Sequence, residues 1–305
     1  MSGQAHDRKP GSNRRRSWLA GIVAAGFMIG GVVWQGSHRA STGPASGIVL
    51  EGNVAASQLP SDGPAEPATL HVASFNIHGG RGTDGVCDLS RIAGLVRGFD
   101  FIGLNEVHGS GTSGPEPQVA LLGRDLHQQW LFAPTERRWW HDHFGNGALT
   151  NLPVSRWYRI PLPSTQARGF RNLIWFAVLW RGQTINVLVT HLDRQVDREL
   201  QLQQVLALFQ SLSPPALLLG DLNTTRADPV LAGFLKTSGA IDLVGPPADP
   251  GNDDGRIDWI LSRGLERVAA GSVVNGASDH PFVWAEVRLP DAIPDSRPED
   301  DENRR

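Results

Sequence analysis

The sequence predicts an α/β domain with mixed β-sheets, and three observations support this fold class. Strand-like apolar runs alternate with helix-like stretches from residue 69 to residue 290. The runs at 173–180 and 184–191 flank the turn sequence RGQ, which indicates an antiparallel hairpin. Alternating strands and helices favour parallel neighbours, so a hairpin among them indicates mixed rather than purely parallel sheets.

The expected strands share one feature, which is a polar residue close to one end. In chain order they cover residues 70–76, 99–106, 147–151, 173–180, 184–191, 216–223, 256–262 and 281–289. Three stretches between them are helix-like, namely residues 88–98, 116–129 and 194–212. In the last of these stretches apolar residues recur near helical spacing, as expected for a helix that covers a sheet.

Composition and charge narrow the classes of function. The chain has 305 residues, of which 40% are hydrophobic and 19% are charged, so it is long enough for one sizeable core. Its formal net charge is −3, so a nucleic-acid substrate would need a local basic patch. Cys87 is the only cysteine, which excludes an intramolecular disulfide and a cluster of thiolate metal ligands.

The first 37 residues have the pattern of a targeting segment. Three consecutive arginines, Arg14 to Arg16, precede an uncharged stretch from Trp18 to Trp34. The pattern favours an uncleaved signal anchor that spans a membrane, and a cleaved signal is the alternative. The arginines would stay in the cytoplasm, so we expect the remainder outside it, either anchored to the membrane or exported after cleavage. No protein partner is indicated.

Composition also divides the rest of the chain. Residues 38–68 are rich in Gly, Ser, Ala and Pro, which predicts a flexible linker. Residues 69–290 carry the alternating pattern and form the expected catalytic domain. Residues 291–305 are charged and contain proline, which is typical of a disordered tail.

Carboxylates, amides and imidazoles recur at the expected strand ends. If the sheets stack, these side chains converge on one edge and form an oxygen-rich group without cysteine, which suits Mg²⁺ or Mn²⁺ better than structural zinc. A single Asp or Asn after a strand is usually a turn former, but Glu and His are not needed for turns. The residues concerned are Asn76, Glu106, His191, Asp221, Asn223, Asp258, Asp279 and His280.

The order of motifs resembles the endonuclease/exonuclease/phosphatase superfamily. The similarity covers nearly all of residues 69–290, and GDLN followed by SDH is its most specific part. The resemblance implies a four-layer α/β sandwich with two mixed β-sheets packed face to face and helices outside. The motifs that carry it are SFNIHGG, GLNEVHG, GNGALTNLPV, VLVTHLD, LLGDLNT, GRIDWIL and ASDHPFV.

The resemblance also implies a reaction, which is metal-dependent hydrolysis of a phosphodiester bond by in-line attack of water. Glu106, Asn76 and Asp279 would bind Mg²⁺ or Mn²⁺. Asp258 would orient His280, and either this pair or Asp221 would accept the proton from water. His191 would hydrogen-bond the phosphate or protonate the leaving group. Asp221 and Asn223 would project from one side of a strand end, because side chains alternate along a strand, and would hold the water and a phosphate oxygen.

The substrate class stays open between two kinds of phosphate ester. Residues 136–147 combine arginines with aromatic residues, which suits either nucleic acid or a lipid interface. We also expect Asn146, Arg168 and Arg171 to contact the substrate. A nuclease-like enzyme is the leading interpretation, and a phospholipid phosphodiesterase or inositol-phosphate-type phosphatase near the membrane is the alternative. A non-catalytic binding module is a remote third.

Overall fold

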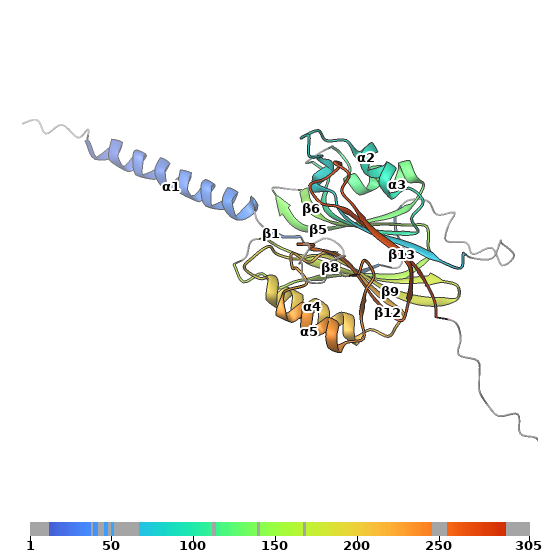
Figure 1. Ribbon diagram of the computed structural model, residues 1–305. Coiled ribbons are helices and arrows are strands. Elements are labelled where there is room, and N and C mark those ends of the chain that lie inside the picture. Colours follow the sequence, from blue (N-terminus) through green and yellow to red (C-terminus); the bar gives the residue numbers. More distant parts are fainter. Residues whose placement is uncertain are drawn as a thin grey trace, which may run out of the picture.

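Two mixed β-sheets packed face to face, with helices on both outer sides, make up the domain (Figure 1). This arrangement confirms the predicted four-layer α/β sandwich. The computed structural model describes the following parts of the chain: residues 12–37, 39–41, 46–47, 50–51, 67–111, 114–138, 141–166, 169–245 and 255–290.

Sheet A has seven strands, and its parallel pair is β3 with β4. All of its other neighbours are antiparallel. Its strands in spatial order are β1 (Arg39–Ala40), β5 (Gln129–Arg138), β6 (His141–Thr150), β4 (Phe101–His108), β3 (Leu70–Asn76), β14 (Phe282–Arg288) and β13 (Glu266–Val273).

Sheet B also has seven strands, and its parallel pair is β9 with β10. β8 and β9 form the predicted antiparallel hairpin around residues 181 and 182. The strands in spatial order are β11 (Ile241–Asp242), β12 (Asp258–Arg263), β10 (Ala216–Asp221), β9 (Gln183–His191), β8 (Asn172–Trp180), β7 (Val154–Pro161) and β2 (Ser46–Gly47).

Helices cover the outer face of each sheet (Figure 1). α2 (Leu89–Val96) and α3 (Gln118–Leu126) pack on sheet A, and the short 3-10 helix η2 (His78–Gly80) follows β3. α4 (Arg198–Ser211) and α5 (Pro229–Thr237) pack on sheet B.

The four layers enclose three apolar cores, and β10 shows how they arise from the sequence. Leu217 and Leu219 point into the core between the sheets, whereas Leu218 points into the core under α4 and α5. Because side chains alternate along a strand, a strand buried on both faces needs a continuous apolar run. The third core lies between sheet A and its helices, where Ile92 and Leu122 pack near Phe75.

The segment predicted as a linker contributes to both sheets where it is described. β1 pairs with β5, β2 pairs with β7, and Leu50 is buried in the core between the sheets. The guanidinium of Arg159 donates a hydrogen bond to the carbonyl of Ser41 at 3.0 Å. These positions extend the domain beyond the predicted start at residue 69. Residues 52–66 and the predicted tail at 291–305 lie outside the described parts of the chain.

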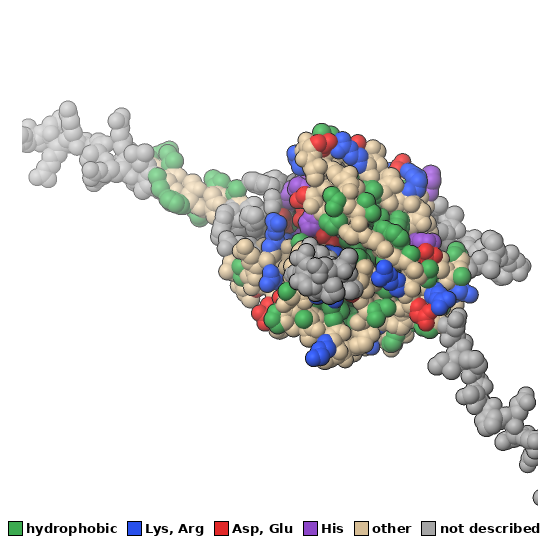
Figure 2. Space-filling view, viewed as in Figure 1, with side chains coloured by type: hydrophobic (Ala, Val, Ile, Leu, Met, Phe, Trp, Pro, Cys, Tyr) green, Lys and Arg blue, Asp and Glu red, His purple; other side chains and the backbone are tan. Residues whose placement is uncertain are grey.

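α1 (Ser12–Ser37) points away from the sandwich and exposes apolar side chains between Trp18 and Val33 (Figures 1 and 2). Phe27, for example, is 80% exposed. Among the helices that the structure describes, none is both long and apolar enough to cross a membrane. The membrane anchor stays a prediction from the sequence.

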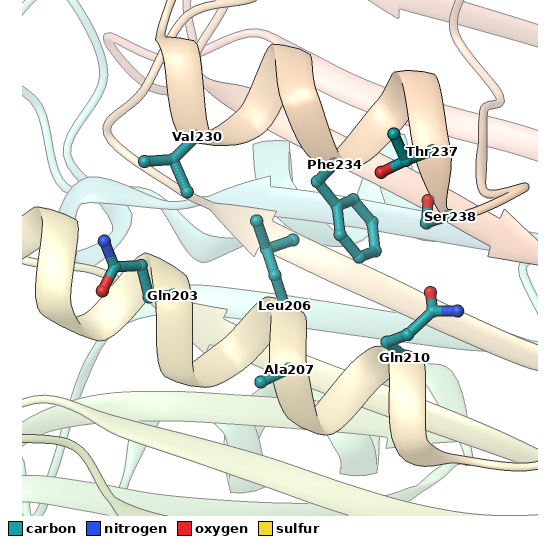
Figure 3. Close-up of a pocket in the computed structure, with 8 residues that line it drawn as sticks. All are labelled: Gln203, Leu206, Ala207, Gln210, Val230, Phe234, Thr237 and Ser238. Atoms are coloured by element: carbon teal, nitrogen blue, oxygen red, sulfur yellow. The ribbon is translucent and has the colours of Figure 1, made fainter.

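α4 and α5 lie side by side on sheet B and leave a groove of about 400 Å³ between them (Figure 3). Leu206 and Phe234 form its apolar floor, and Gln203 and Gln210 lie along one side of it. The groove lies on the outer, helical side of sheet B, not at the sheet edge where the predicted polar residues gather.

Candidate active site

Three of the predicted residues form a row across the edge of sheet B. In the strand register His191 of β9 lies beside Asp221 of β10, which lies beside Asp258 of β12. Their side chains are only 3%, 2% and 1% exposed, respectively. In Figure 2, exposed histidine and acidic side chains lie next to one another at the left edge of the domain. Strand pairing alone therefore brings these three residues together.

Asp221 is the last residue of β10, and a tight turn follows it. The backbone N–H of Asn223 donates to Oδ1 of Asp221 at 2.9 Å, which closes an Asx turn. Asn223 has a positive φ of 48° and its side-chain amide donates to the carbonyl of Leu192 at 2.9 Å. The expectation that strand alternation aligns Asp221 and Asn223 is wrong, because the strand has already ended; the turn places Asn223 instead.

His191 is held by Arg171, which is half-buried. Nη1 of Arg171 lies 3.1 Å from Nδ1 of His191. Arginine can only donate, so Nδ1 accepts and the ring proton lies on Nε2. Nε2 is 3.4 Å from Oδ2 of Asp221. Burial, followed by the charge of Arg171, holds the pKa of His191 well below its ordinary value, so the ring is a neutral donor toward Asp221.

Asp258 and His280 form the predicted pair. Nδ1 of His280 lies 2.9 Å from Oδ2 of Asp258, and its Nε2 lies 3.8 Å from Oδ2 of Asp221. Burial by itself would lower the pKa of His280, but the hydrogen bond and charge of Asp258 outweigh it and raise the pKa to about 9. Burial and the charge of Asp258 raise the pKa of Asp221 to about 6. The ring of His280 is therefore cationic at neutral pH. The carboxyl of Asp221 loses its proton just below neutral pH.

Two amides from sheet A reach the row. Nδ2 of Asn76, at the end of β3, donates to Oδ2 of Asp221 at 3.1 Å. Oδ1 of Asn105 accepts the backbone N–H of Asp221 at 3.0 Å, and its Nδ2 donates to the carbonyl of Thr190 at 3.0 Å. Asn105 thus fastens the two sheets together at the site. Sequence reasoning missed this role, although Asn105 directly precedes Glu106 in its motif.

The other two predicted acidic residues, Glu106 and Asp279, lie at the edge of sheet A together with His78. We call these three residues the rim. Nδ1 of His78 lies 3.3 Å from Oδ1 of Asp279, and these side chains are 43% and 56% exposed. Glu106 is half-buried, and its carboxylate makes no hydrogen bond or ion pair with the residues that the structure describes. Its charge nevertheless acts on Arg171, so it lies within electrostatic range of the site.

Unusual backbone conformations gather at the site. His78, Glu106 and Asn223 have φ values of 47°, 56° and 48°, a region that non-glycine residues rarely adopt. Glu106 lies in an irregular stretch between Leu104 and Val107, where the pairing of β4 with β6 shifts. Such strain persists where the surrounding structure enforces it, and it is enriched at functional sites.

Two groups of residues have the chemistry to hold a divalent cation. Asp221, Asp258 and His280 each offer a ligand atom within 4.8 Å of the others. Oδ1 of Asp258 is buried without a hydrogen-bond partner in the described part of the chain, which is an atom that a cation would satisfy. The second group is the unpartnered carboxylate of Glu106, with Asn76 and Asp279 on the adjoining parts of sheet A. Both groups contain carboxylate oxygens, which suit Mg²⁺ or Mn²⁺, but His280 would have to lose its proton before it could serve as a ligand in the first group.

Of the three predicted substrate contacts, the structure places one in the site. Arg171 lies in the site, as described above. Asn146 is buried, accepts from Nδ2 of Asn105 at 2.8 Å and donates to Oδ1 of Asn172 at 2.9 Å, so it forms a cross-link within the protein. Arg168 lies outside the described residues, as do the two tryptophans at 139 and 140.

A largely buried cluster of charged and aromatic side chains holds the backbone next to the row, and sequence reasoning did not find it. Oδ2 of Asp242 accepts from the guanidinium groups of both Arg226 and Arg256. These groups lie 5.5 and 4.1 Å from the ring centroid of Trp259. Trp259 in turn donates through Nε1 to the carbonyl of Thr224 at 2.8 Å.

This cluster of Asp242, Arg226, Arg256 and Trp259 acts on the site through the backbone. Arg256 also donates to the carbonyl of Asp258 at 3.2 Å. The cluster thus holds the start of β12, which carries Asp258, and the turn that carries Asn223. The arginine of GRIDWIL was the one available signal, because it directly precedes Ile257 and Asp258.

Comparison with solved structures places this arrangement among known folds. A structure described as an endonuclease/exonuclease/phosphatase from Beutenbergia cavernae is 25% identical and has a TM-score of 0.60; the match covers 73% of this chain and 72% of that one. Two further matches share the fold at 18% identity. Zebrafish TDP2 complexed with a single-strand DNA product has a TM-score of 0.55, and the match covers 73% of this chain and 100% of that one. The catalytic domain of human Nocturnin with a bound sulfate has a TM-score of 0.54, with 73% and 95% covered.

Comparison by sequence gives the same answer. No curated protein matches the chain. The model of the Endonuclease/Exonuclease/phosphatase family, however, matches residues 73–280, a range that begins in β3 and ends at His280. This range covers more than half of the chain and contains every predicted catalytic and metal-binding residue. The chain therefore belongs to the Endonuclease/Exonuclease/phosphatase family.

Proposed function

We propose that this family phosphoesterase is a Mg²⁺- or Mn²⁺-dependent phosphodiesterase of nuclease-like type, which hydrolyses its substrate by direct attack of water. The observation that carries the proposal is the environment of the Asp221 carboxylate. Its Oδ2 lies within 3.1 Å of Nδ2 of Asn76, 3.4 Å of Nε2 of His191 and 3.8 Å of Nε2 of His280. Oδ2 of Asp221 is the atom on which the donors of the site converge.

The charges favour Asp221 as the general base. A pKa of about 6 leaves the carboxylate ionised at neutral pH and still able to take a proton from water. His280, with a pKa of about 9, is already protonated, so it serves as a cation and proton donor beside Asp221. Asp258 holds that imidazolium in place through Nδ1.

Arg171 and His191 supply the binding site for the phosphoryl group. The guanidinium of Arg171 is buried, its Nε has no hydrogen-bond partner, and it forms no ion pair within the described residues. Burial outweighs the attraction of the nearby carboxylates of Asp193, Glu106 and Asp221 and lowers the pKa of Arg171, so an anionic ligand would stabilise its charge. His191 then donates its Nε2–H to a phosphoryl oxygen. A divalent cation, when bound, would neutralise charge that develops on the phosphoryl and leaving oxygens.

We also propose that the catalytic domain lies outside the cytoplasm. This part of the proposal is based on the N-terminal sequence pattern alone.

The direct test is hydrolysis of bis-p-nitrophenyl phosphate by the full chain, beside p-nitrophenyl phosphate as a monoester. We expect hydrolysis of the diester that depends on Mg²⁺ or Mn²⁺ and stops with EDTA. Faster hydrolysis of the monoester would contradict the phosphodiesterase assignment and favour a phosphatase. Metal-independent turnover, or none on either ester, would contradict the mechanism.

A further inference from the structure

Three buried asparagines form a continuous series of hydrogen bonds that begins at the backbone of Asp221. The N–H of Asp221 donates to Oδ1 of Asn105 at 3.0 Å, and Nδ2 of Asn105 donates to Oδ1 of Asn146 at 2.8 Å. Nδ2 of Asn146 then donates to Oδ1 of Asn172 at 2.9 Å. Nδ2 of Asn172 donates to the carbonyl of Pro134, also at 2.9 Å. We call Asn105, Asn146 and Asn172 the amide chain.

The two ends of the amide chain fix its direction. A backbone N–H can only donate, so the atom of Asn105 that faces Asp221 is the oxygen. A backbone carbonyl can only accept, so the atom of Asn172 that faces Pro134 is the nitrogen. Asn146 then has one consistent assignment, and all three amides point the same way. The three residues are at most 1% exposed, and buried hydrogen bonds that are aligned strengthen one another.

The amide chain crosses repeatedly between the two sheets. Its members and end points belong, in order, to sheet B (Asp221), sheet A (Asn105 and Asn146), sheet B (Asn172) and sheet A (Pro134). The first, third and fourth of its hydrogen bonds therefore join the sheets. The amide chain thus sets the spacing of the sheets at the edge that carries the site.

This spacing decides whether the donors of the site reach Asp221. Oγ of Ser278 donates to the carbonyl of Asn76 at 2.7 Å and accepts the N–H of His280 at 3.2 Å. Asn76 and His280 are thus tied to sheet A, whereas Asp221 belongs to sheet B. The distances of 3.1 and 3.8 Å from Oδ2 of Asp221 to Asn76 and His280 therefore depend on the spacing that the amide chain maintains.

The backbone beside Asp221 has an unusual conformation that the amide chain also stabilises. Gly220 has a φ of 146°, and an added Cβ would lie 1.9 Å from the carbonyl oxygen of Thr190, so only glycine fits there. Asn105 bonds both sides of this close approach, namely the N–H of Asp221 and the carbonyl of Thr190, each at 3.0 Å. The end of β10 is therefore held by a side chain from the other sheet.

We propose that the amide chain positions the Asp221 carboxylate, and that Asn146 and Asn172 act on the reaction without touching the substrate. This inference rests on the proposed function, because it assigns the residues that hold the proposed base in place. It also gives Asn146 a role other than the predicted substrate contact. Misplacement of a reacting group by about 1 Å can cost roughly 100-fold in rate, so residues distant from the substrate can control turnover.

Hydrogen exchange at the N–H of Asp221, followed by NMR in the full chain, tests the positioning without any substrate. Asn146→Ala removes the middle of the amide chain. The N–H of Asp221 should then exchange about tenfold faster, the factor expected for one weakened buried hydrogen bond. The N–H of Leu218, which is buried in the same strand, should change clearly less, because global unfolding is not the cause.

Asn186→Ala is the matched control, because Asn186 also uses both ends of its amide. Its Oδ1 accepts from Nε1 of Trp175 at 3.0 Å, and its Nδ2 donates to the carbonyl of Ser213 at 2.9 Å. Asn186 lies near the start of β9, at the opposite end from His191. The control should leave both exchange at Asp221 and kcat unchanged.

Kinetics on bis-p-nitrophenyl phosphate shows whether the amide chain acts through Asp221. Asn146→Ala should lower kcat by about tenfold and leave KM within about threefold of the unmodified chain. In an Asp221→Asn background the same substitution should lower kcat by less than about twofold, because the group that it positions is already lost. Asn146→Asp keeps the shape and the acceptor for Asn105, so it serves the same tests where Asn146→Ala does not fold.

The outcomes separate this inference from the proposed function. A rise in KM with unchanged kcat would overturn it and restore the predicted substrate contact of Asn146. Equal losses of kcat in both backgrounds, or equal acceleration of exchange at Asp221 and Leu218, would overturn it in favour of a general structural role. Absence of diester hydrolysis by the unmodified chain would contradict the proposed function. Hydrogen exchange would still decide whether the amide chain holds Asp221.

Discussion

The row on sheet B and the rim on sheet A present carboxylates in opposite environments. Asp221 and Asp258 in the row are at most 2% exposed and hydrogen-bonded to imidazoles and amides. On the rim, Asp279 is 56% exposed and Glu106 has no hydrogen-bond partner in the described residues. Desolvation shifts pKa values, so the buried row is suited to proton transfer. The more exposed rim, with the unpartnered carboxylate of Glu106, is suited to a cation.

Asp221→Asn should give the largest effect, because it removes the proposed base while keeping the shape of the row. We expect kcat on bis-p-nitrophenyl phosphate to fall by at least about 100-fold, the range for general acid–base groups. Asp125→Asn is a suitable control, since Asp125 is exposed and pairs with Arg97 on the surface. Activity of Asp221→Asn within a few-fold of that control would assign the base elsewhere.

Glu106→Gln tests whether the rim holds the cation. Loss of a ligand should weaken Mg²⁺ binding by at least about tenfold, since even outer partners of metal ligands contribute that much. Asp258→Asn, which changes the row instead, should bind Mg²⁺ with nearly unchanged affinity. Isothermal titration of both variants decides between the two candidate groups. The reverse result would place the cation among Asp221, Asp258 and His280.

Arg256→Gln should have a smaller effect, on the order of tenfold in kcat with little change in KM, because it loosens Asp258 without touching the substrate. The matched control is Arg263→Gln at the far end of the same strand. Nη1 of Arg263 donates to three carbonyls at the end of α4, at 2.9 to 3.0 Å. That control should lose roughly 1 to 3 kcal/mol of stability and keep its activity. Equal loss of activity in both variants would mean a general folding defect.

The row was predictable from sequence and its supports were not. Each member of the row ends or begins a strand, so a local pattern reveals it. Asn76 and Asp221, by contrast, meet across 145 residues of chain, and only the packing of the sheets brings them together. Asn146 was expected to contact substrate, but its side-chain oxygen accepts a hydrogen bond from Asn105, which lies 41 residues away in the sequence. A single sequence carries no signal for such pairs.

The backbone of Glu106 shows a second limit of sequence reasoning. Regular alternation would turn Asn105 and Glu106 to opposite faces of sheet A. The irregular pairing at this point and the φ of 56° interrupt the alternation. No residue type in GLNEVHG indicates this irregularity. The identity of the acidic residue was thus predictable, whereas its unpartnered, half-buried state depends on tertiary structure.

The pH dependence of stability distinguishes row and rim without any substrate, in protein freed of metal with EDTA. Asp221 has a folded pKa of about 6 against an ordinary value of 3.8, so between these values the folded protein holds a proton that the unfolded chain has lost. His280 has a folded pKa of about 9 against 6.5, so the same holds in a second, higher window. The free energy of unfolding should therefore fall as pH rises through each window, on the order of 1 to 3 kcal/mol apiece.

Urea unfolding at pH 4, 6, 7 and 9 measures both windows. The contribution of His280 is complete below pH 6.5 and is lost as pH rises through 9, so His280→Gln should flatten the curve between pH 7 and 9. His71→Gln, far from the row, should retain the fall. Stability of the unmodified chain that stays constant from pH 7 to 9 would show that Asp258 does not hold His280 as a cation. The contrast between a buried, titrating row and an open rim would then fail.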